Sequence, residues 1–194
     1  MKIYMIRHGE STANAERKHA GWAQVPLTER GRADAKAAGA LIEGLHFDRV
    51  YVSDLIRARE TMELALPNTE AIESPLLREI SVGELAGFTA AECLEKYGEP
   101  YLTEKGRRNF RPFGGEDYGM HFSRVVEFAG LLAADPVPTV AVFCHEGTIR
   151  CMLDLVEGVR HTPADTPLGN GSVSVFEFDG KSRRCAEWNR TKNA

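Results

Sequence analysis

Two stretches decide the fold of this chain: Ile3-Tyr4-Met5-Ile6-Arg7-His8-Gly9 and Val140-Ala141-Val142-Phe143-Cys144-His145-Glu146-Gly147. Each begins with consecutive apolar residues that do not alternate with polar ones, a pattern typical of strands covered on both faces of a parallel sheet. Each then reaches a histidine and a turn that contains glycine. Because ligands bind beyond the carboxyl ends of such strands, we predict that His8 and His145 lie at that edge of the sheet.

The rest of the chain supplies further strands and the helices between them. Asp48–Ser53 indicates another buried strand, and Ser172–Phe178 alternates like a strand nearer an edge, which could serve dimerisation. Three helices are expected. The first is capped by Thr28 and reaches about Leu45, with Ala33, Ala37, Ala40, Leu41 and Leu45 on its inward side. The second is capped by Ser53 or Asp54 and stops before Pro67, with Leu55, Ala58, Met62 and Ala65 inward. The third runs from about Glu116 to Ala134, with Phe122, Val125, Val126, Ala129, Leu132 and Ala133 inward. The alternation predicts an α/β fold with a mostly parallel central sheet and helices on both faces.

At 194 residues, with 43% hydrophobic residues, the chain is long enough to bury one core, so we expect residues 1–194 to form a single domain. One segment, from about Ile80 to Gly115, has a different character. It is rich in glycine, proline and aromatic residues that we expect to be exposed, namely Phe88, Tyr97, Tyr101, Phe110 and Phe113. We predict a partly helical, lid-like excursion over the mouth of the site.

Composition argues against several classes of partner. A formal net charge of −4 gives no broad basic field for nucleic acid, and no apolar run approaches the length of a signal-peptide core or a membrane span. The four cysteines show no CxxC spacing, and Cys144 and Cys151 suit buried free thiols. We therefore expect a cytoplasmic protein without nucleic-acid or membrane partners; the pattern does not determine the oligomeric state.

The residues after the two buried strands suggest an anion site. Arg7 and His8 are costly to place at a strand end unless an anion meets them, and Gly9 allows close backbone approach. Taken alone, this motif is equally compatible with an ordinary surface loop. His145-Glu146-Gly147-Thr148 repeats the arrangement and favours the anion site, since a helix start there would present free N–H groups. A zinc site would require further ligands, and the chain contains no HExxH or CxxC partners, so we expect no metal.

With these motifs the sequence resembles the histidine phosphatase superfamily, which includes phosphoglycerate mutases and their phosphatase relatives. The resemblance covers nearly the whole chain. It rests on six segments in the family's order: Arg7–Glu10 with Asn14; Pro26–Gly31; Ser53–Thr61; Leu77–Glu79 followed by Gly83–Gly87; Gly114–Glu116 leading to Arg124; and His145–Gly147.

The resemblance implies a role for each matching residue. His8 would be the nucleophile that forms a phosphohistidine, and Glu79 the general acid and base. Arg7, Arg57 and a protonated His145 would hold the phosphoryl oxygens, with Asn14 and Ser53 as secondary hydrogen-bonding partners. Arg57 is preferred to Arg59 because it matches the family pattern. The remaining histidines, His19, His46, His121 and His161, match no family position and are expected to be surface or packing residues.

The expected activity is a phosphatase that acts on a small phosphorylated metabolite without metal or other cofactor. Ala20 stands before Gly21-Trp22 where mutases have a threonine, and Val82 replaces their usual aromatic residue, so water is favoured as the acceptor. A mutase is the nearest alternative, because Lys105, Arg107, Arg108 and Arg111 could hold a second anionic group; a solvated basic face explains them equally well. An α-ribazole phosphatase, a sugar-bisphosphatase and a broad-specificity phosphatase fit equally, and a non-catalytic phosphate-binding module is the alternative from another class.

Overall fold

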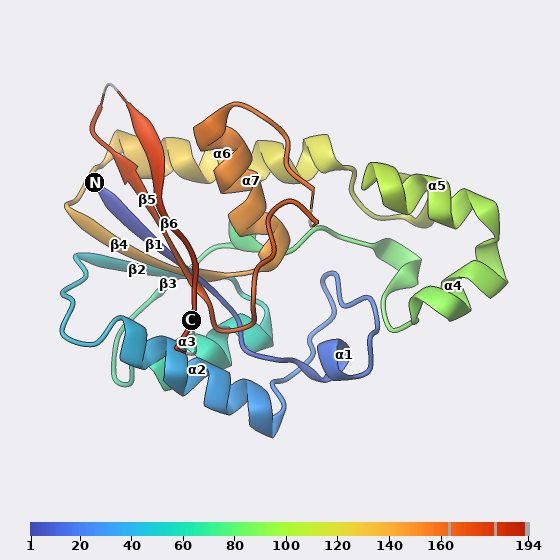
Figure 1. Cartoon of the computed structure of the whole chain (residues 1–194), viewed down its shortest axis with the longest axis horizontal. Coiled ribbons are helices and arrows are strands. Elements are labelled where there is room, and N and C mark those ends of the chain that lie inside the picture. Colours follow the sequence, from blue (N-terminus) through green and yellow to red (C-terminus); the bar gives the residue numbers. More distant parts are fainter. Residues whose placement is uncertain (163, 181, 193–194) are drawn as a thin grey trace.

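The computed structural model describes residues 1–162, 164–180 and 182–192, and a mixed sheet runs through its centre (Figure 1). The strands are β1 (Lys2–Arg7), β2 (Arg49–Val52), β3 (Ile72–Glu73), β4 (Thr139–Cys144), β5 (Val173–Phe178) and β6 (Arg183–Arg190). Their order in the sheet is β3-β2-β4-β1-β5-β6. The first four in this order are parallel, whereas β5 runs antiparallel to β1 and β6 antiparallel to β5. The predicted mostly parallel sheet is therefore confirmed.

Helices cover both faces of the sheet and complete three layers. The helices are α1 (Thr12–Ala15), α2 (Glu29–Leu41), α3 (Ile56–Ala65), α4 (Ala90–Tyr97), α5 (Glu99–Arg107), α6 (Tyr118–Ala134) and α7 (Glu146–Glu157), with short 3₁₀ turns at Pro75–Leu77, Gly83–Leu85 and Arg111–Phe113. In Figure 1, α2 and α3 lie below the sheet and α6 and α7 above it. One apolar core joins the sheet to α2 and α3, and a second joins it to α6 and α7. The three-layer prediction is confirmed.

The register of the sheet places the two strand-end histidines side by side. Arg7 on β1 pairs with Cys144 on β4, and the backbone N–H of His8 donates to the carbonyl of Cys144 at 3.0 Å. His8 and His145 are therefore the next residues on neighbouring parallel strands. The tertiary pairing brings together two residues that are 137 positions apart in the sequence.

Several local predictions were wrong. In α2 the buried residues are Gly31, Ala35 and Ala38, not the stripe that begins with Ala33. Alanines lie on every side of this helix, so their spacing does not reveal which side packs. In α6, His121, Val125, Phe128 and Leu132 are buried, whereas Val126 from the predicted stripe is exposed. β5 lies second from the edge of the sheet, which agrees with the prediction of a strand nearer an edge, but β6 flanks it, so Ser172–Phe178 is not itself the edge strand.

The start of α3 also differs from the prediction, because its N-cap is Leu55 and no side chain caps it from that position. Ser53 and Asp54 are engaged elsewhere: the Ser53 hydroxyl bonds His145, and Asp54 accepts from Arg78. Instead, the side-chain oxygen of Gln24 accepts from the backbone N–H of Ile56 at 2.8 Å. Residues distant in sequence thus set the entry of the chain into α3.

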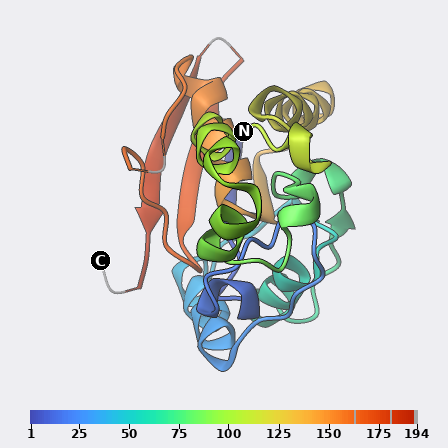
Figure 2. The ribbon, with the colours of Figure 1, turned by 90° about the vertical axis from the view of Figure 1, so that its right-hand side faces the viewer.

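The segment from about residue 80 to 115 forms α4, α5 and two of the 3₁₀ turns. It stands at the right-hand end of the molecule in Figure 1 and faces the viewer in Figure 2. The expectation that its aromatic residues are exposed was wrong for Tyr101, Phe110 and Phe113. They are buried with Val82, Leu85 and Cys93 in a small third core. This core gives the segment its own packing, separate from that of the sheet.

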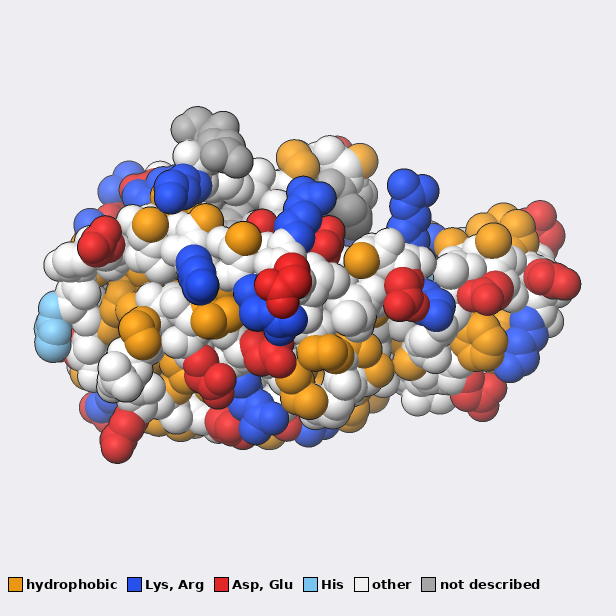
Figure 3. Space-filling view, turned by 90° about the horizontal axis from the view of Figure 1, so that it is seen from below, with side chains coloured by type: hydrophobic (Ala, Val, Ile, Leu, Met, Phe, Trp, Pro, Cys, Tyr) orange, Lys and Arg blue, Asp and Glu red, His pale blue; other side chains and the backbone are white. Residues whose placement is uncertain are grey.

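The surface shows no single-sign field on the face seen in Figure 3, where acidic and basic side chains are interspersed. Within the residues that the structure describes, no helix is long and apolar enough to cross a membrane. The four cysteines are free thiols, and Cys93, Cys144 and Cys151 are buried.

Candidate active site

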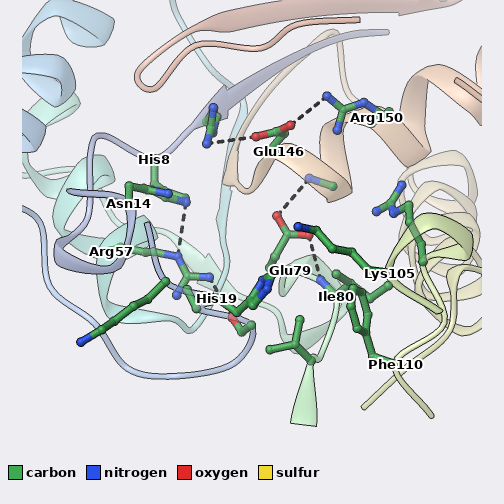
Figure 4. Close-up of a pocket in the computed structure, with 17 residues that line it drawn as sticks. His8, Asn14, His19, Arg57, Glu79, Ile80, Lys105, Phe110, Glu146 and Arg150 are labelled. Carbon is green, nitrogen blue, oxygen red and sulfur yellow. Dashed lines mark hydrogen bonds and ion pairs between the residues drawn. The ribbon is translucent and has the colours of Figure 1, made fainter. Parts of the chain in front are cut away.

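A pocket of about 340 Å³ opens beyond the carboxyl ends of β1 and β4 (Figure 4). Its wall comes from the strand ends, the loop after α1, the start of α3, the start of α7 and the segment from about residue 80 to 115. The lining residues are Arg7, His8, Asn14, Lys18, His19, Ala20, Gly21, Arg57, Glu79, Ile80, Val82, Lys105, Arg108, Phe110, Glu146, Gly147 and Arg150. Most of the residues predicted for the site meet here.

His8 presents a lone pair at the floor of this pocket. Its Nδ1 lies 2.7 Å from the carbonyl oxygen of Gly9. A carbonyl only accepts, so Nδ1 carries the proton and Nε2 the lone pair. The Nε–H of Arg57 donates to this Nε2 at 3.3 Å. Burial, followed by the charges of Arg57 and Arg7, lowers the pKa of His8 well below its usual 6.5, so the imidazole is neutral at pH 7.

His145 lies beside His8, with ring centroids 5.1 Å apart, but it is fully buried and does not line the pocket. The hydroxyl of Ser53 accepts from the N–H of Leu55 and so has its own proton for Nε2 of His145, at 2.9 Å. With Nε2 as the acceptor, Nδ1 carries the proton of the neutral ring, and it is buried without a partner among the described residues.

Burial and then the charge of Arg57 lower the pKa of His145 well below 6.5. The expectation that His145 is protonated was therefore wrong: low-dielectric surroundings and neighbouring cations disfavour the imidazolium. A neutral His145 still donates one N–H. Any positive charge on this ring would have to be induced by a bound anion.

Arg57 is buried at the first turn of α3, and its guanidinium is oriented by backbone carbonyls. Nη1 donates to Ala23 at 3.0 Å and Nη2 to Gly21 at 2.9 Å. Burial lowers the pKa of Arg57 to about 10, which still leaves it charged at pH 7. Arg59 instead pairs with Glu73 at the surface, so the structure places Arg57 and not Arg59 in the pocket.

Arg7 is held by partners from the carboxyl-terminal half of the chain. Its Nη2 pairs with Glu146 at 3.0 Å, and its Nη1 donates to the carbonyl of Leu168. Glu146 also pairs with Arg150 at 2.9 Å, which continues the chain of charges along α7. The Nε of Arg7 is buried and has no partner among the described residues.

Glu79 faces these groups from the loop between two 3₁₀ turns (Figure 4). One carboxylate oxygen accepts from the backbone N–H of Gly147 at 3.0 Å and the other from that of Ile80 at 2.8 Å. Gly147 has no room for a side chain, because a Cβ there would lie 2.1 Å from Oε1 of Glu79. The start of α7 and the Glu79 carboxylate are thus in direct contact.

The two secondary residues occupy different positions. Asn14 lines the pocket, and its Oδ1 accepts from the backbone and hydroxyl of Ser11 in a capping box, which leaves its NH₂ group available. Ser53 is fully buried and does not line the pocket. Its hydroxyl contacts His145, so it acts on the site through that ring.

The four basic residues predicted as a second anion site divide into two pairs. Lys105 and Arg108 line the pocket, whereas Arg107 pairs with Glu104 and Arg111 with Asp117 outside it. Nη1 of Arg108 is buried without a partner among the described residues.

Sequence reasoning missed four ionisable lining residues: Lys18, His19, Glu146 and Arg150. Glu146 follows His145 directly, and Arg150 lies one helical turn further on, so the start of α7 carried a signal for both. Nothing local marked Lys18 or His19. The loop that carries His19 reaches the pocket because Nε2 of His19 bonds the Tyr101 hydroxyl at 2.7 Å.

Two buried histidines and two arginines beyond the ends of adjacent parallel strands, with a carboxylate opposite, define the class of this protein as an enzyme that handles phosphate groups. The family follows from comparison with known proteins. The chain belongs to the histidine phosphatase superfamily (branch 1), whose family model matches residues 3–191.

The similar proteins are named as phosphoglycerate mutases or as phosphatases. The chain is 38% identical, over 78% of its length and 73% of the relative's, to a 2,3-bisphosphoglycerate-dependent phosphoglycerate mutase 2 from Gloeobacter violaceus. A 2,3-bisphosphoglycerate-dependent phosphoglycerate mutase from Cytophaga hutchinsonii is 30% identical over 92% of this chain and 88% of its own. Among structures, a putative α-ribazole-5′-phosphate phosphatase from Escherichia coli superposes with a TM-score of 0.90 at 25% identity, covering 98% of this chain and 96% of that one.

Proposed function

We propose that this protein is a metal-independent phosphatase that hydrolyses a small phosphorylated metabolite through a phosphohistidine on His8. The observation that carries the proposal is the state of His8: a neutral ring, its Nδ1–H bound to Gly9, and its Nε2 lone pair directed toward Arg57 at the pocket floor. A neutral imidazole with a fixed tautomer is an effective nucleophile near pH 7.

The reaction proceeds in two displacements. In the first, Nε2 of His8 attacks phosphorus, the bond between phosphorus and the leaving oxygen breaks, and protonated Glu79 gives its proton to that oxygen. In the second, Glu79 takes a proton from water as the water oxygen attacks phosphorus. The phosphorus–nitrogen bond then breaks, its electron pair returns to Nε2, and inorganic phosphate leaves.

Charge on the transferring phosphoryl group is balanced by Arg57 and Arg7, with the N–H of His145 and the NH₂ of Asn14 as further donors. The unpartnered Nε of Arg7 and Nδ1 of His145 support these assignments, because buried donors without partners fit a ligand that supplies the acceptors. Side-chain cations therefore provide the positive charge that a metal ion supplies in other phosphatases.

Hydrolysis is favoured over transfer to a second substrate by two wall residues. Ala20 and Val82 both line the pocket, at the positions where the sequence departs from the mutase pattern. Ala20 offers no hydroxyl to a second substrate and Val82 no aromatic face. The resemblance in fold to an α-ribazole-5′-phosphate phosphatase accords with this reading.

Phosphoglycerate mutase activity is the second candidate, and Lys105 and Arg108 favour it. Both line the pocket beyond the phosphoryl-binding residues, where they could bind a carboxylate or second phosphate of the substrate. The two mutase relatives support this alternative.

The deciding experiment measures phosphate release from a panel of phosphorylated metabolites in EDTA, alongside interconversion of 3-phosphoglycerate with a bisphosphoglycerate primer. Selective phosphate release in EDTA supports the phosphatase. Interconversion without release would assign the protein as a mutase, and phosphate binding without turnover would make it a non-catalytic module. We also propose that the protein acts in the cytoplasm, because its free thiols suit a reducing compartment.

A further inference from the structure

The short segment Gly21-Trp22-Ala23 contacts both Arg57, which would bind the phosphoryl group, and Glu79, the proposed acid. The carbonyls of Gly21 and Ala23 accept from the two terminal nitrogens of Arg57. Between them, Nε1–H of Trp22 donates to the backbone carbonyl of Glu79 at 2.7 Å. A segment of three residues thus joins the arginine that would hold the phosphoryl group to the proposed acid.

Trp22 itself does not line the pocket, and 38% of its surface is exposed to solvent. Its ring is nevertheless held in place, because the guanidinium of Arg78 lies 4.7 Å from the ring centroid. Arg78 is in turn anchored by Asp54, which its Nε contacts at 2.8 Å. An exposed indole that is stacked on a cation and hydrogen-bonded to a catalytic residue's backbone is more ordered than its exposure suggests.

Arg124 is the second donor to the carbonyl of Glu79, at 3.3 Å. This contact is the longer of the two, and the Arg124 guanidinium also bonds Glu116 through two donors at 2.8 Å each. Arg124 also donates through Nη1 to the carbonyls of Leu76 and Arg78, so it holds the chain that leads to Glu79, whereas Trp22 makes the shorter contact to the Glu79 carbonyl itself.

The conformation and close packing of Gly21 fix the position of this segment. Its φ is +49°, in the left-handed region, and a Cβ would approach the Val82 side chain to 2.7 Å. The segment is therefore packed closely against the chain that follows Glu79, and a shift of one would move the other.

We propose that Trp22 is a positioning residue that sets the distance between the Glu79 carboxyl and the phosphoryl group bound by Arg57. This inference rests on the proposed function, in which Glu79 protonates the leaving oxygen. Loss of the indole N–H should impair proton donation and leave phosphoryl binding intact. The defect is expected to grow as the leaving group becomes a poorer one.

The test uses Trp22→Phe, which keeps an aromatic ring for Arg78 and removes the N–H together with the five-membered ring of the indole that carries it. We expect kcat/KM to fall roughly tenfold with β-glycerophosphate, and much less with p-nitrophenyl phosphate, whose phenol leaves with little protonation. The matched control is Trp188→Phe, since Nε1 of Trp188 donates at 3.1 Å to the carbonyl of Pro167, outside the pocket. That variant should leave the ratio of the two rates unchanged.

A double-mutant cycle separates positioning from general damage to the fold. In a Glu79→Gln background, Trp22→Phe should have little further effect on β-glycerophosphate, because there is no acid left to position. Equal losses with both substrates, or a full additional loss in the Glu79→Gln background, would overturn the role of Trp22. If the unmodified protein releases phosphate from neither compound nor from any metabolite of the panel, the proposed function itself fails, which is a different result.

Discussion

The imidazole rings of His8 and His145 lie 5.1 Å apart, between centroids, at the carboxyl ends of the neighbouring strands β1 and β4. Burial, followed by the charge of the adjacent Arg57, lowers the pKa of each. Two imidazolium rings this close to a buried arginine would repel one another. The pair is therefore neutral, and the nucleophile keeps its lone pair without a separate base to deprotonate it.

Replacing His8 by Ala should abolish turnover, because His145, the other imidazole beside Arg57, does not line the pocket. We expect a loss of at least about 10³-fold in kcat with the melting temperature little changed. Steady-state phosphate release measures the loss. The acid lability of the phosphoprotein that remains after rapid quenching identifies a phosphohistidine. His46→Ala, in which the replaced side chain is 88% exposed, should retain full activity. Activity of His8→Ala near that of the unmodified protein would rule out the mechanism.

Glu79→Gln should slow turnover more strongly for a more basic leaving group, because such a group must be protonated as it departs. With an alkyl phosphate we expect a loss of about 10²-fold or more in kcat/KM, and with p-nitrophenyl phosphate a much smaller one. The comparison is Glu84→Gln, an exposed glutamate in the following 3₁₀ turn that does not line the pocket. Equal losses for both substrates would show that Glu79 is not the acid.

Gly147→Ala should displace the Glu79 carboxylate, since the added Cβ would lie 2.1 Å from its Oε1. A displacement of about 1 Å costs roughly 10²-fold in rate, so we expect a large fall in kcat. Gly130→Ala in α6 has nothing within 4 Å of its Cβ and should keep activity while gaining a little stability. Unchanged kcat in Gly147→Ala would mean that this contact does not matter to turnover.

Arg108→Gln tests whether the wall of the pocket binds a second anionic group. Loss of a charged hydrogen bond costs about 1.5–3 kcal/mol, so KM for a substrate with two anionic groups should rise at least about tenfold. KM for p-nitrophenyl phosphate, which has only the phosphoryl group, should stay the same. Arg107→Gln removes a neighbouring charge that pairs with Glu104 outside the pocket and should affect neither substrate. Parallel effects of the two variants would indicate a general electrostatic influence and no specific subsite.

Acid should destabilise the protein through its buried histidines. Burial, followed by the charges of Arg124 and Arg108, lowers the pKa of His121 from 6.5 to about 3. The unfolded chain therefore takes up a proton below pH 6.5 that the folded chain does not. The free energy of unfolding should fall by up to about 1.4 kcal/mol per pH unit for each such histidine as the pH drops from 6.5 toward 4.

Urea unfolding at pH 7.0, 6.0 and 5.0 measures this slope, and His121→Gln should make it shallower by about one proton. The amide retains an N–H that can replace the bond from Nε2 of His121 to the Thr148 hydroxyl, which spans 3.2 Å. Identical slopes for the two proteins would show that His121 does not remain neutral in the folded state.

Features that depend on local periodicity and on chain order were predictable from sequence. The buried strands before His8 and His145 were predicted, because consecutive apolar residues require cover on both faces. The position of the two histidines at the carboxyl ends of parallel strands was predicted with them. In α3, Ala58, Met62 and Ala65 are buried as expected, since this helix has a distinct apolar side. The six family segments led to Arg57, Glu79 and the superfamily to which the chain belongs.

Only the tertiary structure decided which polar groups face one another. The Ser53 hydroxyl meets His145 across 92 residues, and Arg57 meets His8 across 49, so no local pattern shows that Ser53 contacts the ring and not the pocket. Nor does a local pattern show that Lys105 and Arg108 line the pocket while Arg107 and Arg111 lie outside it. The burial of Tyr101 and Phe113 likewise depends on packing between segments. The charge of His145 was mispredicted because protonation depends on burial and on neighbouring cations, and both arise only when distant segments pack together.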